Sequence, residues 1–180
     1  GLKSRFLNDR IQLNAAAFIN DISYMQFSVF LEGSGGAAST VANAGAATVK
    51  GLELELAAQV SENFRIGLNY GYLDTEYDEF IELGQDVRNQ KDFPYAPEST
   101  ASLDLDWSVM ALAWGQLSLH VDWSYKDSFV PYTNKDQNFT SQIKPYDVVN
   151  ARLTLGDVAL GGSVLEVSLW GKNVFDEEYR

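Results

Sequence analysis

The chain has 180 residues, 25 of them acidic and 13 basic, and its formal net charge of −12 argues against a nucleic-acid-binding surface. It contains no cysteine, so disulfides and thiolate metal sites are excluded. No run approaches the ~18 apolar residues of a membrane-spanning helix, but this test is blind to membrane β-barrels, whose strands are only half apolar.

Apolar and polar residues alternate along most of the chain, and this pattern predicts strands with one apolar and one polar face. In the stretch KGLELELAAQV (50–60), Leu52, Leu54 and Leu56 fall on one face while Glu53 and Glu55 fall on the other. The same alternation predicts about eight strands, at residues 2–6, 11–19, 52–60, 64–72, 101–109, 117–125, 149–155 and 165–169.

The predicted connections alternate between short and long. Short turns are expected at residues 8–9, 61–63, 111–115 and 156–162, and long loops at residues 31–44, 78–97 and 131–145. In an antiparallel up-and-down sheet, alternate connections lie at the same end. All the long loops therefore gather at one end, which is typical of an outer-membrane barrel with short periplasmic turns and longer external loops.

Strand length and aromatic content favour the same architecture. The segments 45–60 and 115–130 can run past the ~10 residues that a tilted strand needs to cross the hydrocarbon layer. Aromatic side chains close to the long loops are expected to form a girdle at the level of the lipid headgroups. The residues concerned are Tyr24, Phe27, Phe30, Tyr70, Tyr72, Tyr77, Trp123, Tyr125 and Phe129.

Several stretches of the chain carry recognisable motifs. In NAGAATVKGLELEL (43–56) an asparagine-glycine loop leads into a Gly-x-Glu-x-Glu strand, and FPYAPESTASLDLDW (93–107) contains a Pro-x-x-Pro strand entry. Both stretches resemble parts of TonB-dependent outer-membrane receptors. VSLWGKNVFDEEYR (167–180) resembles the penultimate strand and its Asn-Leu-Phe-Asp ending, with Val174 in place of leucine. The amino-terminal GLKSRFLNDRIQLNAAAFINDISYMQ has the hairpin pattern of the family.

The resemblance implies an all-β, antiparallel up-and-down transmembrane barrel, of which these strands form part. Family barrels have about 22 strands and a plugged lumen. Neither a plug-like domain nor a final strand is recognisable here, so residues 1–180 are expected to be one domain, the C-terminal part of the barrel. The implied partners are outer-membrane lipid and, in the full-length protein, a plug domain and the TonB complex.

The polar positions of the strands are the candidate functional residues. A closed barrel in lipid places apolar side chains outward and polar ones toward the lumen or the plug. A basic residue on the lipid face near the midplane would cost about 2–4 kcal/mol. The expected lumen-facing or plug-facing residues are Glu53, Glu55, Arg65, Asn69, Asp104, Asp106, His120, Asp122 and Arg152.

Enzymatic and metal-binding interpretations are weaker. His120 is the single histidine and lies on the polar face, whereas hydrolases of outer-membrane barrels present their serine and histidine to lipid. The acidic segment 73–83 lacks the spacing of an EF-hand, and GSGGAAS (33–39) lacks the lysine of a phosphate-binding loop. The pair Asp104 and Asp106 repeats a pattern found in several strands. We therefore expect no catalytic residue, metal or cofactor.

The leading functional interpretation is energised uptake of a scarce nutrient, such as a siderophore, cobalamin or an oligosaccharide, across the outer membrane of a Gram-negative cell. Two alternatives stay open. One is a self-standing barrel of about eight strands with an anchoring or adhesive role. The other is a soluble β-sandwich or lipocalin-like binder, because a half-buried strand shows the same alternation.

Overall fold

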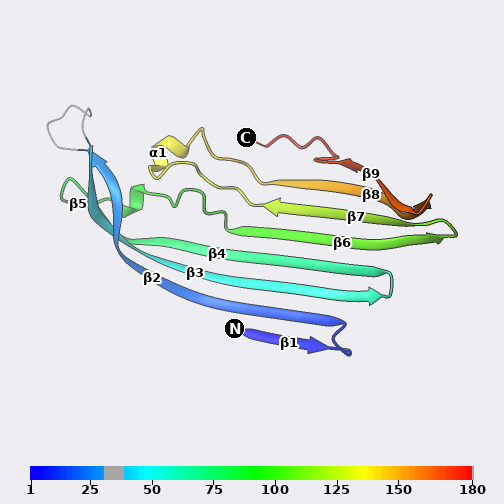
Figure 1. Cartoon of the computed structure of the whole chain (residues 1–180). Helices are drawn as coiled ribbons and strands as arrows, with labels where there is room; N and C mark the ends of the chain where they lie inside the picture. Colours follow the sequence, from blue (N-terminus) through cyan, green and yellow to red (C-terminus); the bar gives the residue numbers. More distant parts are fainter. Residues whose placement is uncertain (31–38, 180) are drawn as a thin grey trace.

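The computed structural model describes residues 1–30 and 39–179, which form one antiparallel sheet with small additions at one end (Figure 1). The strands are β1 (Leu2–Phe6), β2 (Ile11–Phe30), β3 (Ser39–Ser61), β4 (Phe64–Glu82), β5 (Gln85–Asp86), β6 (Ser99–Leu112), β7 (Gly115–Lys126), β8 (Tyr146–Leu160) and β9 (Ser163–Gly171). A 3₁₀ turn, η1 (Arg88–Gln90), and a short helix, α1 (Lys135–Asn138), complete it.

Strands that follow each other in the sequence lie side by side in the sheet. The order is β1-β2-β3-β4-β6-β7-β8-β9, and the two-residue β5 pairs with β4. The prediction of an antiparallel up-and-down sheet of about eight strands is thereby confirmed. In the described residues the sheet does not close on itself, and β1 and β9 form its two edges (Figure 1).

The short and long connections lie at opposite ends of the sheet, as predicted (Figure 1). The short turns are 7–10, 62–63, 113–114 and 161–162, and the long loops are 83–98 and 127–145. Gly161 and Gly162 both have positive φ, of 55° and 86°, which a two-residue hairpin of this kind requires. The connection between β2 and β3, including all of GSGGAAS (33–39) except Ser39, lies outside the described residues.

Two predicted loop boundaries were wrong. Strand β3 begins at Ser39 and β4 runs to Glu82, so the predicted loops 31–44 and 78–97 each contain residues that belong to strands. The cause is pairing between the strands: β2, β3 and β4 continue their register far beyond the alternating segments. Conversely, β7 ends at Lys126, short of the predicted extension to residue 130.

The register sorts the side chains onto two faces. One cross-strand row reads Leu13–Leu56–Leu68–Leu103–Trp123–Val149, and the row beside it reads Gln12–Ala57–Gly67–Asp104–Asp122–Asn150. Because neighbouring positions of a strand point to opposite faces, the first row belongs to an apolar face and the second to a polar face.

Neither face of the main sheet is covered by protein in the described residues. On the apolar face, Leu52 is 39% exposed, Trp107 43% and Leu169 76%. The buried hydrophobic residues of the described part are Ala47, Tyr77 and Phe80, all close to the long loops. A soluble sandwich would bury these leucines against a second sheet, and the described residues form no such sheet.

The helices of the described residues include none with the length and apolarity to cross a membrane.

Candidate functional site

The nine predicted site residues lie together on the polar face. Arg65, Asp106, His120 and Arg152 occupy consecutive positions of one cross-strand row. The neighbouring rows hold Asp104 opposite Asp122, Glu55 opposite Asn69, and Glu53 opposite Gly71. The structure therefore brings all nine onto one surface; what faces that surface remains a prediction.

Hydrogen bonds join several of these side chains across the strands. Asp106 is the most connected: its Oδ1 lies 2.7 Å from His120 Nδ1, and its Oδ2 lies 3.7 Å from Arg65 Nη1. His120 Nε2 stands 4.0 Å from Asp122 Oδ2, and Asn150 Nδ2 donates to Asp122 Oδ1 at 2.7 Å. His120 is thus flanked by carboxylates on both sides.

The other members of the face make fewer contacts. Asn14 Nδ2 donates to Glu55 Oε2 at 2.9 Å, and Asn69 Nδ2 donates to Ser102 Oγ at 3.1 Å. Arg152 is paired in register with Trp170 of β9, an exposed aromatic residue on the otherwise polar face. The side chains of Arg65 and Asp106 are 58% and 48% exposed, so this surface can receive further partners.

Toward the long loops, the two faces of β2, β3 and β4 exchange their character. The row Ala17–Leu52–Tyr72 is followed on the same face by Ile19–Lys50–Asp74 and then by Asp21–Thr48–Glu76. On the opposite face, the row Ala16–Glu53–Gly71 is followed by Phe18–Gly51–Leu73, by the mixed row Asn20–Val49–Thr75 and then by Ile22–Ala47–Tyr77. The apolar face of these strands therefore ends at the level of Lys50 and Asp74.

The second of these faces carries an aromatic cluster at the loop end. The ring of Tyr77 stacks on Phe93 with centroids 4.2 Å apart, and Phe80 lies 5.2 Å from Tyr77 and 4.4 Å from Phe27. The prediction that Phe27 and Tyr77 join the headgroup girdle was wrong. Phe93 of the loop 83–98 stacks on Tyr77, and Phe27 packs against Tyr77 and Phe80 in the same cluster. By contrast, Tyr70, Tyr72, Trp123 and Tyr125 do lie on the apolar face.

The two long loops are joined to each other. Asp92 N–H donates to Thr133 O at 2.7 Å, and Tyr95 N–H donates to Val130 O at 2.9 Å. Asn138, which is 6% exposed, donates from Nδ2 to Asp92 Oδ2 at 3.1 Å. Loops 83–98 and 127–145 therefore form a single unit.

Lys91 is a buried cation within this unit. The residue is 8% exposed, and its Nζ lies 2.7 Å from Glu82 Oε2, 2.6 Å from Asn134 Oδ1 and 4.7 Å from the centroid of the Phe80 ring. One ammonium group thus connects the end of β4 with both loops.

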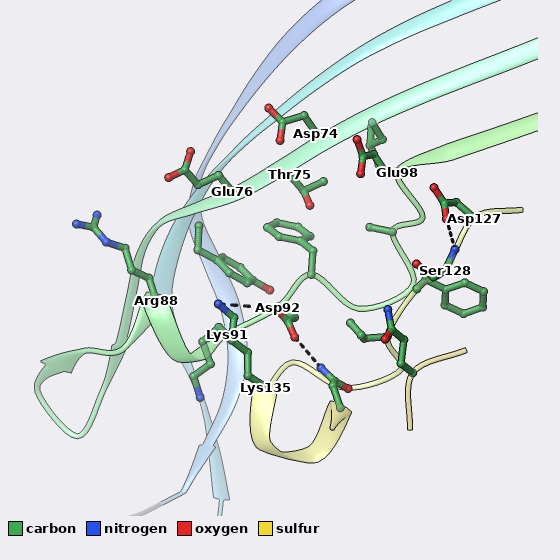
Figure 2. Close-up of a pocket in the computed structure, with 18 of the residues that line it drawn as sticks. Asp74, Thr75, Glu76, Arg88, Lys91, Asp92, Glu98, Asp127, Ser128 and Lys135 are labelled. Carbon is green, nitrogen blue, oxygen red and sulfur yellow. Dashed lines mark hydrogen bonds and ion pairs between the residues drawn. The ribbon is translucent and has the colours of Figure 1, made fainter. Parts of the chain in front are cut away.

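A pocket of about 780 Å³ lies between β4 and the joined loops (Figure 2). One wall is the β4 segment 73–77, and the other is formed by the loop segments 88–98 and 127–142. Asp74, Glu76, Glu98 and Asp127 contribute carboxylates, while Arg88 and Lys135 contribute cations. In the described residues no group of histidine and carboxylate side chains has the arrangement of a metal site.

Two groups near this pocket titrate away from their ordinary ranges. Backbone N–H donation from Arg88 and Phe80, each at 3.2 Å, lowers the pKa of Asp86. Burial in the aromatic cluster, together with the charge of Asp92, raises the pKa of Tyr77 to about 12. Both pKa shifts arise from contacts that exist only when the loop unit is folded.

Sequence reasoning did not find Lys91, Asn138 or the pocket. These residues lie in non-repeating loop segments, where alternation carries no information, and their partners are more than forty positions away in several cases. The prolines of FPYAP, at positions 94 and 97, mark the entry to β6 but not the loop pairing.

A family profile described as "TonB dependent receptor-like, beta-barrel" matches residues 1–174. The chain belongs to this family. Members are receptors and transporters rather than enzymes, and homologues of this TonB-dependent receptor chain are outer-membrane proteins.

Solved receptors share the fold at low sequence identity. The siderophore receptor PiuA from Acinetobacter baumannii aligns with a TM-score of 0.70 at 22% identity, over 98% of this chain and 24% of that receptor. The ferric yersiniabactin uptake receptor FyuA from Yersinia pestis aligns with a TM-score of 0.72 at 20% identity, over 99% and 24%. The ferric-catecholate import receptor Fiu from E. coli K12 aligns with a TM-score of 0.68 at 20% identity, over 98% and 22%.

The chain therefore spans about a quarter of the length of the receptors that it matches. At these identities the likeness concerns the fold.

Proposed function

We propose that residues 1–180 are one domain, a part of the barrel wall of an outer-membrane receptor that imports a scarce nutrient with energy supplied through the TonB complex. The observation that supports this most is the two-faced register. Six neighbouring strands place leucine, tryptophan and valine in one row, and in the next row four of the six carry an amide or a carboxylate while the other two carry alanine and glycine. Lipid on one side and a wet, plugged lumen on the other would account for that division.

In this proposal the polar face turns toward the lumen and the plug domain. Asp104 and Asp122 lie directly opposite each other, and like charges in such pairs destabilise a sheet. A basic or hydrogen-bonding partner placed over this surface would offset their repulsion. The exposed Arg65 beside them gives the same surface a cation that can pair with a plug carboxylate, while the half-buried His120 already lies beside Asp106 and Asp122.

The joined loops would then stand on the cell exterior, where nutrient is captured. A siderophore is the first candidate, because PiuA, FyuA and Fiu are described as receptors for siderophores or their ferric complexes. Cobalamin and oligosaccharides are the other candidates. The pocket beside the loops offers aromatic and carboxylate groups that suit a ligand rich in hydrogen-bond donors.

Uptake by intact cells tests this function. Accumulation of ⁵⁵Fe would be measured with a panel of ferric siderophores in wild-type cells, in cells lacking the receptor, and in cells lacking TonB. We expect one ferric complex to lose uptake in both deletion strains, and plasmid-borne receptor to restore it in the presence of TonB. Unchanged ⁵⁵Fe uptake for every complex would contradict the siderophore assignment, and labelled cobalamin and maltooligosaccharide would then be measured in the same strains.

A further inference from the structure

Among the residues that the structure describes, strand β4 has an edge without a strand partner at the level of the pocket. Its pairing with β6 ends at Tyr72 and Ser99, and one further bond, from Leu73 N–H to Glu98 O at 2.9 Å, closes that ladder. Backbone bonding on the same side resumes at Phe80, whose C=O accepts from Val87 N–H at 2.8 Å, and continues at Ile81 with β5. Figure 2 shows the loop turning away from β4 between these points.

The backbone of Thr75 points into this gap. Backbone groups of successive strand residues alternate between the two sides of the strand, so Thr75 presents its N–H and C=O on the same side as Leu73 N–H. No backbone bond in the described residues reaches Thr75 on that side. Five consecutive residues of β4, 73–77, line the pocket. Consecutive residues of a strand share an edge but not a face, so this wall of the pocket is the edge of β4.

The edge is bordered by negative charge. Asp74, Glu76 and Glu98 are exposed, and all three line the pocket. Asp74 and Glu76 alternate with Thr75 along β4, so their carboxylates are two positions apart on one face. The cations of the pocket have other partners. The ammonium group of Lys91 is held by Glu82 and Asn134. Arg88 contacts Asp86 and the backbone C=O of Asp78, and Lys135 contacts Asp92 and the backbone C=O of Asn89.

We propose that the open edge of β4 receives an extended basic peptide segment as an added strand. Its backbone would pair with Thr75, and lysine or arginine at alternate positions would face Asp74 and Glu76. Strand addition of this kind obtains affinity from main-chain hydrogen bonds and specificity from alternate side chains. This edge forms one wall of the pocket that the proposed function offers to the nutrient, so peptide and nutrient would share the same space. Its use as a docking point for a protein partner at the cell surface rests on that proposed function, whereas binding of the peptide in micelles is measured independently of uptake.

Binding to the full-length receptor in detergent micelles tests the proposal. The probe is the fluorescein-labelled peptide acetyl-Lys-Val-Lys-Thr-Lys-Val-amide, followed by fluorescence anisotropy. Two further versions carry N-methyl groups on the odd or on the even backbone nitrogens, which removes hydrogen-bond donors from one side of the extended peptide and leaves its charge unchanged.

We expect one methylation pattern to weaken binding on the order of tenfold and the other to leave it unchanged, because one side of an added strand faces β4. Equal effects of both patterns, no effect of either, or no binding of the parent peptide would overturn the proposal. A version with glutamate in place of lysine is expected to lose binding.

Variants of the receptor locate the site. Glu76→Gln is expected to weaken binding of the parent peptide several-fold, while the matched Glu62→Gln, in the short turn at the other end of the sheet, leaves it unchanged. Thr75→Pro removes the backbone N–H and is expected to abolish binding. Heat-modifiable gel mobility checks that this variant folds. If the variant does not fold, the methylated peptides alone decide whether the peptide binds as an added strand. Equal affinity of Glu76→Gln and Glu62→Gln would place the peptide elsewhere.

Discussion

The aromatic ring of Phe18 in β2 lies over the α-carbon of its cross-strand partner Gly51 in β3. A Cβ added to Gly51 would collide with Phe18 Cζ and stand 2.6 Å from Cε1. Glycine weakens a strand because it offers no side chain to pack, and an aromatic ring placed over it restores part of that loss. The pair marks the level at which the polar face becomes apolar toward the loops.

Gly51→Ala is therefore expected to destabilise the barrel, because the new methyl group must displace the Phe18 ring. Overpacking of this kind costs about 1–3 kcal/mol. Urea unfolding of the receptor in detergent, followed by heat-modifiable gel mobility, measures the change.

Gly67→Ala is the matched control, since a Cβ at Gly67, on the same face, meets nothing closer than Asp104 Cβ at 3.6 Å. This variant is expected to unfold at the wild-type urea concentration. Phe18→Ala combined with Gly51→Ala should recover part of the loss. Equal stability of the two single glycine variants would contradict the role given to the ring.

Lys91→Met is expected to separate the two long loops. Its ammonium group is buried between Glu82 and Asn134, and removing it leaves both oxygens without their donor. Such a loss costs about 1–3 kcal/mol locally. Hydrogen exchange is expected to accelerate at the amides of Asp92 and Tyr95, which donate across the loops.

Lys135→Met is the control for this variant. Lys135 also contacts the other loop: its Nζ donates to Asn89 O at 2.9 Å and stands 4.0 Å from Asp92. Its side chain is 51% exposed, so water screens both contacts. Exchange at Asp92 and Tyr95 should stay close to wild type. If both lysine variants accelerated exchange equally, the buried ammonium would not be the group that joins the loops.

The loop unit is expected to lose stability in alkaline solution. Burial holds the pKa of Tyr77 at about 12 in the folded protein, against about 10 in an unfolded chain. Below pH 10 both states keep the proton, so stability is unaffected; from pH 10 toward 12 only the unfolded state releases it, so stability falls. The thermal midpoint between pH 9 and 11.5 should decline more steeply in wild type than in Tyr77→Phe.

The alternating strands could be predicted from the sequence because the two faces meet different surroundings. In β3, leucine stands at positions 52, 54 and 56 and glutamate at positions 53 and 55. Only one strand register keeps the leucines on one face and the glutamates on the other, because a slip of one residue would exchange the two faces. The structure accordingly places all nine predicted polar residues on one face.

The loop end could not be predicted in the same way. Phe27 and Tyr77 have aromatic side chains near strand ends, which suggests a lipid-headgroup girdle, yet the fold-back of the loop through Phe93 buries Tyr77 on the other face. That outcome depends on contacts between distant segments, such as Lys91 with Asn134, and no local pattern encodes them.

Substitution of two adjacent residues tests which face meets lipid. Leu68 lies in the middle of the apolar row and Asn69 in the neighbouring polar row. Leu68→Arg is expected to cost about 2–4 kcal/mol if Leu68 lies near the bilayer midplane, whereas Asn69→Arg should be tolerated because its side chain meets water or the plug. Urea unfolding in lipid vesicles measures the stability of both variants. In detergent micelles, whose apolar interior is softer, the two variants should differ less in stability.

A greater loss of stability for Asn69→Arg than for Leu68→Arg would mean that the polar face, with Glu55 and Asp104, is turned toward the membrane. That result would contradict the proposed transport function.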